Sequence, residues 1–514
     1  MTRRCLPGLL AAGLTACTVG PDYRPVEPAA PARWQAGPVD TAGSSTMDAE
    51  ALKSWWKHFG DAELDRLMDQ ALSSNLDLKM ALTRIDQARA ERRIVRSALL
   101  PSVNAAAGAQ RNDNPFPGFA PGIRFNLFEL GFDALWEIDL FGGQRRKLEA
   151  ASADLEAASE QHAQALVTLT ADLARDYAEY RGLQNQLKIT RANLDTQQRT
   201  LQLTEKLFGE GVGTRHDVVR ARAQTEATEA RIPALESELT AALHRLEVLT
   251  AQQPGALAAQ LGETAAIPTA PANVLLISPA ETLSRRPDLR AAERRLAAAT
   301  AMQGAATAEL FPKISIAAFL GLRNTDIEKL FRSAAFSWST GATLLQPLLN
   351  FGRIQAGIDL TEAQQREAYL AYEKAVLEAL RETETALTRY LKEEVRRQSL
   401  ARSVTDQRES VRLAQLRYQE GVSSFLDVLD AQRALFAAET ELTQSETAVS
   451  TNLIAVYKSL GGGVGADQAL ALTGKTDADI AHRPGPRPHD TDWIERMLNA
   501  VGIDPGRNHD ATAQ

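Results

Sequence analysis

The sequence contains only two cysteines, Cys5 and Cys17, among its 514 residues. Both lie near the N-terminus, so no disulfide within a chain can stabilise the rest of the fold. An excess of positive charge is also missing, because 57 Lys and Arg stand against 65 Asp and Glu, for a net charge of −8. A nucleic-acid-binding surface is basic, and this composition therefore speaks against a nucleic-acid partner.

Long apolar stretches are missing as well. Beyond the N-terminus no run of about 18 apolar residues occurs, and we expect no helix that spans a bilayer. Hydrophobic residues nevertheless make up 44% of the chain and charged residues 24%, which is typical of folded proteins. These features exclude a helical membrane transporter and a globally disordered chain.

Motifs for catalysis or metal binding are also absent from the sequence. The seven histidines are scattered, and no two of them have metal-ligand spacing. Gly474-Lys475-Thr476 resembles the end of a phosphate-binding loop, but Ala469 stands where that loop needs glycine. No Ser, Cys or Lys lies in a recognisable nucleophile motif. We therefore expect no enzyme, no metal site and no cofactor other than a covalent lipid.

The expectation of a covalently attached lipid comes from the sequence of the N-terminus. Residues 1–16 read as a signal peptide, with two arginines before a short apolar stretch. The segment ends in Leu14-Thr15-Ala16-Cys17, which resembles a bacterial lipobox and predicts cleavage before Cys17 and lipid attachment to it. Thr18 rather than Asp follows, which favours sorting to the outer membrane. Residues 17–60 are rich in proline and are expected to form a stiff tether.

The rest of the chain contains one unit twice. A shift of 210 residues aligns Phe141-Gly142 with Phe351-Gly352 and Glu210-Gly211-Val212 with Glu420-Gly421-Val422. A shift of 211 aligns Leu100-Pro101 with Phe311-Pro312. Such matches indicate an internal duplication. We expect each unit to contain a helix, a strand pair, a very long helix, a tip turn and a return helix.

The long helices are predicted from apolar residues at seven-residue steps. A sustained period of 3.5 residues indicates a left-handed supercoil with neighbouring helices. The two helices are predicted over about 143–208 and 352–419, each roughly 100 Å long at 1.5 Å per residue. The seam residues are Leu166, Leu173, Tyr180, Leu187, Leu194, Leu201 and Phe208, then Val376, Thr383, Tyr390, Arg397, Val404, Val411 and Tyr418. This pattern alone also fits a coiled-coil stalk.

The strand pairs argue against a simple stalk. They are predicted over about 101–140 and 312–350, where apolar and polar residues alternate with a period of two. Strands of this kind, each about ten residues long, cross outer membranes as parts of barrels, although a soluble sheet packed on the helices remains an alternative. A closed membrane barrel needs at least about eight strands, so four per chain predict a shared barrel. Three chains would supply twelve strands.

The tips between long and return helices have their own signals. Gly211, Gly213 and Gly421 suit the left-handed position that ends a helix. Thr214 with Asp217, and Ser424 with Asp427, fit a variant of the capping box that begins the next helix. Both tips are therefore predicted to be tight helix reversals, with the two aspartates acting mainly as caps.

Together the lipobox, the following Val19-Gly20-Pro21-Asp22-Tyr23, the twofold repeat and the tip sequences resemble TolC-type outer membrane efflux proteins, in particular the lipid-anchored branch that serves resistance-nodulation-division (RND) pumps. The resemblance covers about residues 61–460. It implies a mixed α/β membrane protein: a trimeric 12-stranded β-barrel continuous with a long α-helical barrel, plus a small equatorial α/β region.

The resemblance also implies a periplasmic gate at the tips. Asp427 and Asp430 would surround the axis, with Leu426 as an apolar constriction and Arg433 as a partner for Asp430. Six carboxylates from three chains would repel one another and attract cations. In the family the positions of Asp217 and Tyr418 are hydrogen-bonded to each other. Some members add an arginine to this lock, where the present chain has Ser423.

The function implied is the passive outer membrane exit duct of a tripartite pump, conducting drugs or other toxic small molecules out of the periplasm. Its partners would be two further copies, a periplasmic adaptor, an inner membrane RND pump and outer membrane lipid. The residues expected to contact the adaptor are Gly211, Val212, Gly213, Thr214, Gly421, Val422, Ser423 and Ser424. The duct of a type I protein secretion system and a structural coiled-coil lipoprotein are the alternatives.

The expected organisation follows the repeat. After the signal peptide and tether, the first unit covers 61–275, with its tip at 209–217 and a return helix to about 250. The second unit covers 276–460, with its tip at 420–427 and a return helix to about 460. Residues 461–514 form a C-terminal tail, expected to be equatorial or partly disordered.

Overall fold

The structure, a computed structural model, describes residues 18–36, 49–114, 123–269 and 277–463. These residues belong to one structural unit, Met1–Gly465. The predicted signal peptide, Cys17 and the C-terminal tail from residue 464 lie outside the described residues.

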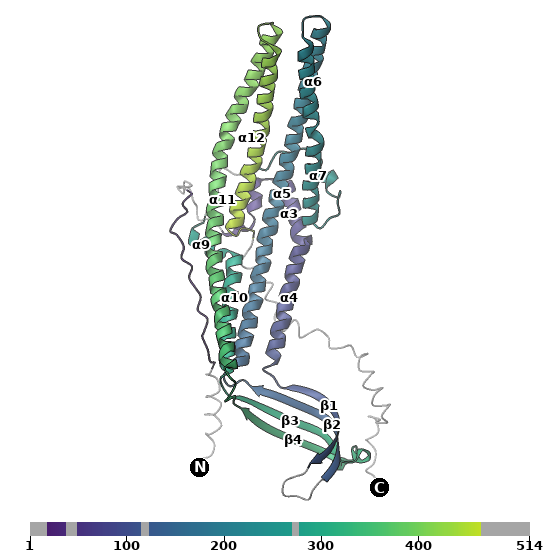
Figure 1. Cartoon of the computed structure of the whole chain (residues 1–514), viewed down its shortest axis with the longest axis vertical. Coiled ribbons are helices and arrows are strands. Elements are labelled where there is room, and N and C mark those ends of the chain that lie inside the picture. Colours follow the sequence, from purple (N-terminus) through teal and green to yellow (C-terminus); the bar gives the residue numbers. More distant parts are fainter. Residues whose placement is uncertain (1–17, 37–48, 115–122, 270–276, 464–514) are drawn as a thin grey trace. The chain divides into compact units, whose positions relative to one another are not determined.

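The two repeats follow one another along the chain with the same order of elements (Figure 1). The first consists of α3 (Ala62–Ser74), α4 (Leu76–Ser97), β1 (Ser102–Asn114), β2 (Ile123–Ile138), α5 (Gly143–Gly209), α6 (Arg215–Glu229) and α7 (Arg231–Leu249). The second consists of α9 (Pro279–Arg285), α10 (Pro287–Ala308), β3 (Lys313–Asn324), β4 (Phe336–Leu345), α11 (Arg353–Gln419) and α12 (Phe425–Ser459). Shorter elements are α2 (Ala49–Lys53), η3 (Trp55–Phe59), α8 (Ala258–Leu261), η4 (Ile327–Lys329) and η5 (Ser333–Ala335).

The long helices α5 and α11 have 67 residues each. Gly142 and Gly352 precede them with φ of 82° and 83°, a left-handed conformation that glycine adopts without strain. At 1.5 Å per residue each helix is about 100 Å long. The bounds agree with the predicted ones to within a residue.

The return helix of the first repeat differs from our expectation of one continuous helix. It breaks at Ala230 into α6 and α7, while α12 of the second repeat is continuous. Pro233 lies in the first turn of α7, where it has no N–H to donate to the carbonyl of Glu229 and its ring would clash with that carbonyl. The second repeat has Thr443 at the corresponding position, which interrupts nothing.

The predicted heptad seam of α5 is buried in the middle of the helix but only partly toward the tip, whereas Val404 and Val411 of the α11 seam are buried. Leu166, Leu173, Tyr180 and Leu187 are buried, whereas Phe208 is 46% exposed. Beyond Leu187 the buried positions of α5 are polar: Thr190, Gln197 and Thr204. Of the apolar seam predicted for this end of α5, Leu194 and Leu201 are half-buried and only Phe208 is exposed, because polar residues at other positions share the contact.

The strands form a single antiparallel sheet in the order β1-β2-β3-β4. Phe132 pairs with Ala105 on one side and Leu320 on the other, and Leu320 pairs with Trp338. Because paired residues point to the same side of a sheet, the predicted apolar alternations combine into one apolar face across all four strands. The prediction of two strand pairs is confirmed.

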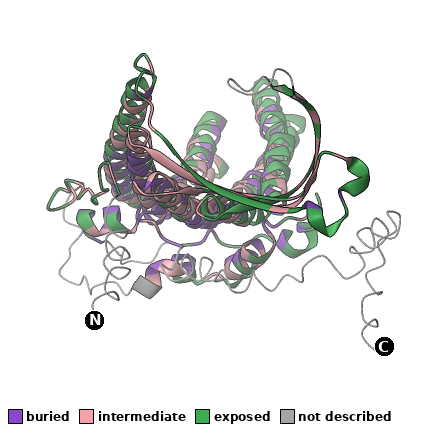
Figure 2. Cartoon of the chain, turned by 90° about the horizontal axis from the view of Figure 1, so that it is seen from below, coloured by how far each residue is buried: buried purple, intermediate pink, exposed green. Residues whose placement is uncertain are grey.

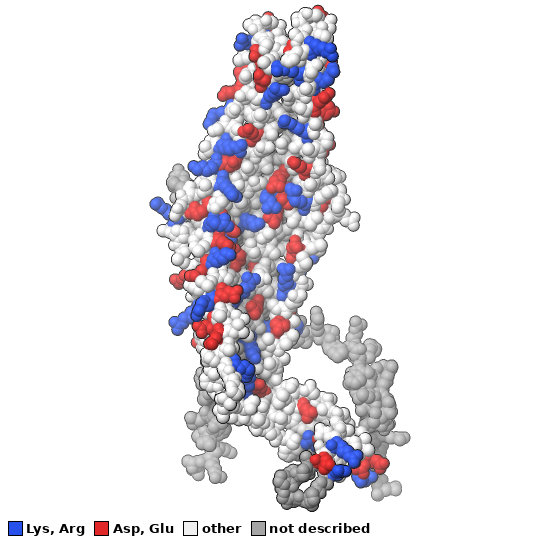
Figure 3. Space-filling view, viewed as in Figure 1, with Lys and Arg blue, Asp and Glu red and all other residues white. Residues whose placement is uncertain are grey.

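The apolar face is largely uncovered in the single chain. Phe132 is 57% exposed and Trp338 is 68% exposed. Figure 2 shows the strands mainly in the colours of exposed and intermediate residues, while buried residues concentrate in the helices. In Figure 3 the part of the sheet in view carries few charged side chains except toward its far end. The connection between β3 and β4 contains an ion pair of Lys329 with Asp326 at 2.8 Å.

The opposite face of the sheet is more polar and more tightly packed. Arg323 pairs with Glu129 at 2.6 Å and lies over the ring of Phe319, 3.9 Å from its centroid. Gly131 and Gly321 face each other across β2 and β3, and a Cβ at either one would come within 3 Å of the Phe319 ring and of backbone. Glycine is thus required at both positions for the ring to lie flat on the strands.

The largest core lies in the middle of the helical part, where α5, α7, α11 and α12 meet the short helices near α3. Trp55 stacks on Tyr457 with ring centroids 5.2 Å apart, and both are fully buried. The described residues of this equatorial region form helices and turns. None of the helices within the described residues is long and apolar enough to cross a membrane.

Residues 18–36, here called the N-terminal strap, are bound along the helices rather than forming a free tether. The Val19 N–H donates to the Phe141 carbonyl at 3.2 Å, and the buried Arg146 pairs with Asp22 at 2.6 Å. Farther along, Trp34 donates to the carbonyl of Ile277. The strap thereby joins both repeats.

Candidate functional site

The first tip reverses the chain within a few residues. After α5 ends, Gly211 adopts φ of 77°, and the N–H groups of Val212 and Gly213 both donate to the Leu207 carbonyl at 3.0 Å. Gly213 has no left-handed backbone, contrary to our expectation. A Cβ there would be crowded, 3.1 Å from the backbone nitrogen of Phe208, although the second tip has Ser423 at the corresponding position.

The second tip repeats this geometry. Gly421 has φ of 71°, and the N–H of Val422 donates to the Arg417 carbonyl at 2.9 Å. Both return helices begin with the predicted capping box, formed by Thr214 with Asp217 and by Ser424 with Asp427. The capping role of both aspartates is thus confirmed.

The two tips expose small apolar side chains. Val212 is 76% exposed and Val422 is 65% exposed, although valine is usually buried. Leu426, the predicted constriction, is 41% exposed. Each tip therefore presents an apolar knob on a rigid, capped reversal. Ser423 differs from its neighbours because its hydroxyl is buried without a hydrogen-bond partner.

Behind the second tip lies a small apolar cluster that sequence reasoning missed. Phe425 is 4% exposed and packs on Tyr418 with ring centroids 5.6 Å apart. Leu429 and Ala221 complete the buried cluster, so it connects α11 and α12 with α6 of the first repeat. The signal was present in the repeat alignment, since Phe425 replaces Arg215 at the first position of the return helix.

The hydrogen bond expected between Asp217 and Tyr418 is not formed within the described chain. The Asp217 carboxylate accepts from the Thr214 hydroxyl at 2.6 Å instead, as the cap geometry demands. The two residues nevertheless interact electrostatically, because burial raises the pKa of Tyr418 and the negative charge of Asp217 raises it further. The capping box and the expected hydrogen bond to Tyr418 both need the Asp217 carboxylate. In this structure the carboxylate serves the capping box.

Arg433 connects the two repeats near the tips. Its Nε donates to Oε1 of Gln224 on α6 at 2.7 Å, while its distance to the Asp430 carboxylate is 3.9 Å. Gln432, one residue earlier, donates to the Thr200 hydroxyl of α5 at 3.2 Å. The Asp430 side chain is 62% exposed, so Arg433 mainly holds α12 against α6 and only weakly neutralises Asp430.

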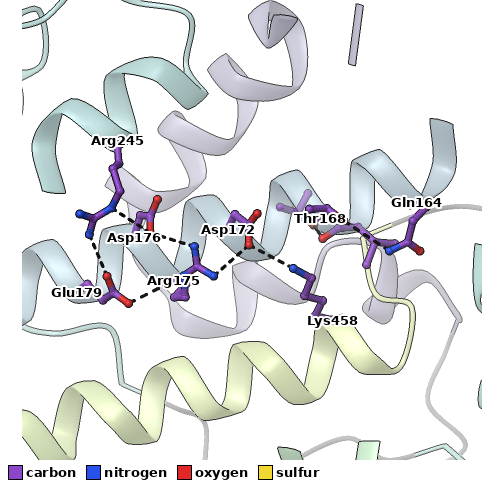
Figure 4. Close-up of polar contacts among 10 residues, drawn as sticks. Gln164, Thr168, Asp172, Arg175, Asp176, Glu179, Arg245 and Lys458 are labelled. Carbon is purple, nitrogen blue, oxygen red and sulfur yellow. Dashed lines mark hydrogen bonds and ion pairs between the residues drawn. The ribbon is translucent and has the colours of Figure 1, made fainter. Parts of the chain in front are cut away.

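Farther from the tips, a row of ion pairs fastens α5 to its neighbours (Figure 4). Arg245 of α7 pairs with Glu179 at 3.0 Å, and Arg175 joins Glu179, Asp176 and Asp172 along α5. Lys458 of α12 completes the row at 3.2 Å from Asp172. Figure 4 shows these side chains reaching α5 from the two flanking helices. Toward the tips from this row, α12 contacts the first repeat through Gln432, Arg433, the stacking of Arg231 on Phe436 and the cluster around Phe425.

The described residues contain no group of three or more His, Cys, Asp or Glu side chains placed to hold a metal ion. What the tips provide is mechanical: two rigid reversals, exposed carboxylates and a small set of links between helix pairs. Together with the apolar sheet face and the long helices, this arrangement is typical of a channel-forming outer membrane protein.

Comparison with known proteins agrees with the assignment to a channel-forming outer membrane protein. The sequence model of the family described as "Outer membrane efflux protein" matches residues 67–252 and 278–462, which are the two repeats. The chain belongs to this family, and it is an outer membrane exit duct for efflux that extends into the periplasm.

Individual relatives are similar over nearly their whole length. The chain is 33% identical to the pyoverdine export outer membrane protein OpmQ of Pseudomonas aeruginosa, over 86% of this chain and 93% of that one. It is 31% identical to the toluene efflux pump outer membrane protein TtgI of Pseudomonas putida, over 90% and 99%. Among solved structures it resembles the outer-membrane channel OprN, with a TM-score of 0.79 and 39% identity, over 87% and 99%.

Proposed function

We propose that three copies of this chain form a gated duct whose periplasmic tips receive cargo from an adaptor protein and an inner membrane RND pump. The observation that carries the proposal is the apolar sheet face, on which Phe132 and Trp338 are largely exposed. Such a face is stable in lipid only if every strand edge is paired. One chain leaves β1 and β4 as edges, and three chains supply about twelve strands, enough to close a membrane barrel.

A lipid on Cys17 would add a second membrane attachment. Thr18, the next residue, lies against Gly142, because a Cβ on that glycine would be 2.9 Å from the Thr18 Cα. Gly142 separates the end of β2 from the start of α5. The acyl chains would therefore enter the bilayer where the strands meet the helices, which is the periplasmic surface of the membrane in this account.

The tips would contact the adaptor. Val212 and Val422 are exposed at equivalent positions, so three chains would present six apolar knobs of the same kind. Helical partners bind such surfaces through apolar anchors that fit between residues on adjacent turns. The glycines beside the valines leave room for close backbone approach.

The same tips would form the gate. Asp427 is partly committed to its cap, while the side chain of Asp430 is 62% exposed and has only a distant partner in Arg433. Three Asp430 carboxylates close to one axis would resist tight closure unless cations or protons offset their charge. Opening would require α11 and α12 to move away from α6, which breaks the bond between Arg433 and Gln224 and opens the cluster around Phe425.

The cargo would consist of small organic molecules chosen by the pump. A wide tube discriminates weakly among solutes, and relatives named for pyoverdine and for toluene share the same fold.

Conductance of the purified trimer in planar bilayers tests the gate. Asp430→Ala combined with Tyr418→Ala should raise the current at a given voltage, because the charged ring and the packing of the Tyr418 ring on Phe425 are both lost. Asp359→Ala, on an exposed part of α11 far from the tip in sequence, is the matched control and should leave the current unchanged. Unchanged conductance in the double variant would remove these residues from the gate.

A further inference from the structure

The two helix hairpins that end in the tips meet along buried polar residues. The first hairpin consists of α5 with α6 and α7, the second of α11 with α12, and each ends in its own tip (Figure 1). Within the described chain, α6, α7 and α12 are the main neighbours of the tip half of α5. The buried residues called the polar seam here are Thr190, Gln197, Thr204, Thr225, Thr228 and Gln432.

The hydrogen bonds of the polar seam are incomplete at its two glutamines. Each threonine hydroxyl donates to the backbone carbonyl four residues earlier in its own helix, at 2.8–3.1 Å. Gln197 and Gln432 are 3% and 4% exposed. Within the described residues, both amide atoms of Gln197 and the Oε1 of Gln432 have no hydrogen-bond partner, while the Nε2 of Gln432 donates to the Thr200 hydroxyl at 3.2 Å. A buried polar group without a hydrogen bond destabilises the arrangement that buries it.

The packing within the second hairpin is apolar at the same distance from its tip. Helices α11 and α12 form the most extensive contact between two helices of the described chain. In this region α11 buries Val404 and Val411. The image of Gln197, meaning the residue at the corresponding position of the other repeat, is Gln407, which is only half-buried. Images are 210 residues apart from Phe141 onward and 211 residues apart before the strands. An apolar seam thus keeps α11 and α12 together as one body.

Nearer the middle of the molecule the two hairpins are in close contact. Gly182 of α5 lies against Thr447 of α12, and a Cβ on this glycine would be 3.0 Å from the Thr447 Cγ2. Farther from the tip, Lys458 pairs with Asp172 at 3.2 Å. At 1.5 Å per residue, roughly 35 Å of α12 lies between Thr447 and the tip. The close contact therefore holds one end of this stretch, while the polar seam accompanies the other.

We propose that Gln197 and Gln432 favour opening of the tip, and that the second hairpin swings about the contact between Gly182 and Thr447. The inference rests on the proposed gate and adds what sets its balance. In the closed tip the amides are buried and lack partners. When the second hairpin swings away from α5 and α6, water reaches the polar seam and supplies the missing hydrogen bonds. The closed state is therefore less favoured than its apolar packing alone would make it.

The apolar cluster around Phe425 acts in the opposite direction. Phe425 and Leu429 of the second hairpin are 4% and 2% exposed and form a cluster with Ala221 of the first. Opening exposes this apolar surface to water, which favours the closed state. The open fraction follows from the difference between the two effects. Because both act between the same two hairpins, a change at one can offset a change at the other.

Current through the purified trimer in planar bilayers tests this balance. Phe425→Ala should raise the current, because it removes the largest side chain of the cluster. Adding Gln197→Met should lower the open fraction of that variant about tenfold, because methionine has nearly the size of glutamine and needs no hydrogen bond. Gln198→Met is the matched control. Gln198 is the next residue but is exposed, so its change should leave the current of the Phe425→Ala protein as it is.

The melting temperature separates a role in the gate from a structural role alone. Gln197→Met should raise it, because a buried unpaired amide is removed. If it rises while the current of the Phe425→Ala protein stays the same, the inference is wrong and the gate stands. A lower melting temperature would show that the amide is paired in the closed tip, which also overturns the inference.

The proposed gate has its own outcome in this experiment. If Phe425→Ala leaves the current of a folded trimer unchanged, the gate fails and the inference fails with it. Leu429→Ala is a smaller change in the same cluster. It takes the place of Phe425→Ala if light scattering shows that the latter variant does not form trimers.

Discussion

The two repeats have the same elements but very different surroundings. Of the 67 residues in each long helix, 27 are buried in α5 and only 10 in α11, and this difference shows which helix lies inside the chain. Helix α5 packs against α3, α4, α6, α7, α10 and α12, while α11 packs against α9, α10 and α12. The heptad seam is thus buried in much of both helices, but α5 also buries many positions outside the seam that α11 leaves exposed.

The difference teaches that burial in this chain follows from the position of a helix and not from its sequence pattern alone. Where α5 is enclosed, its residues differ in kind from those at the paired positions of α11. Arg181 is 4% exposed and its image in α11 is Leu391, while Gly182 touches Thr447 so closely that a Cβ would lie within 3.0 Å of its Cγ2. Changes at paired positions should therefore have unequal effects.

The largest difference in stability between paired positions is expected at Arg181, whose counterpart in α11 is Leu391. Its guanidinium donates to Gln184 Oε1 at 2.7 Å, to the Glu263 carbonyl at 2.8 Å and to the Tyr177 hydroxyl at 3.1 Å. Arg181→Leu leaves these buried acceptors unpaired and should lower the free energy of unfolding by about 3 kcal/mol. Denaturant titration followed by circular dichroism measures it. The control is Arg199→Leu, whose side chain is 77% exposed, with an expected change below about 0.5 kcal/mol.

A smaller difference in stability between paired positions is expected at Gly304, where α10 meets the N-terminal strap. A Cβ at Gly304 would lie 2.9 Å from the Arg146 Nε, and Gly20 packs on the same glycine. Gly304→Leu should lower the unfolding free energy by about 2 kcal/mol, because overpacking displaces the Arg146 side chain and the strap. The image position is the exposed Arg93, where Arg93→Leu should be close to neutral in the monomer. Equal effects at the two positions would show that the repeats are not surrounded differently.

The tips should behave alike in stability and differently in conductance. Asp217→Ala and Asp427→Ala each remove a capping box, which costs about 1 kcal/mol for either helix. Thermal unfolding of the purified protein compares them. Only Asp427→Ala should also change the current in planar bilayers, since Asp427 is proposed to lie near the axis. If Asp217→Ala changes the current as much, the gate involves both tips equally.

The smallest expected effect concerns pH. Burial lowers the pKa of His162, which is 6% exposed, and its image Tyr372 does not titrate in the same range. Because the folded pKa lies below the unfolded one, the stabilisation is complete above about pH 6.5 and is lost as the pH falls, when the unfolded chain takes up the proton first. His162→Leu should flatten the decline in melting temperature between pH 7 and 5. His216→Leu, at the exposed tip, should retain it.

Much of the fold could be predicted from the sequence because local signals were strong. Glycines, capping residues and seven-residue steps fixed the bounds of α5 and α11 and both tip reversals. The sheet followed from alternation over ten or more residues. These features depend on neighbours close in the chain, which a single sequence records directly.

The parts that could not be predicted depend on contacts between distant segments. Nothing local indicates that Asp22 reaches Arg146 or that Arg433 bonds to Gln224. The seam near the tip was only partly right, because Leu194 and Leu201 are half-buried while Thr190 and Gln197 take the fully buried positions. Phe425 was missed because its burial depends on Ala221 of α6, which lies in the other repeat.

The central claim is that copies of the same chain cover the surfaces that the second repeat leaves open. The protein mass of the detergent-purified particle, from light scattering with the detergent contribution subtracted, tests it most directly. The account predicts a mass of three chains at every salt concentration that keeps the protein soluble. A mass of one chain, with the helical and strand content intact, would contradict it.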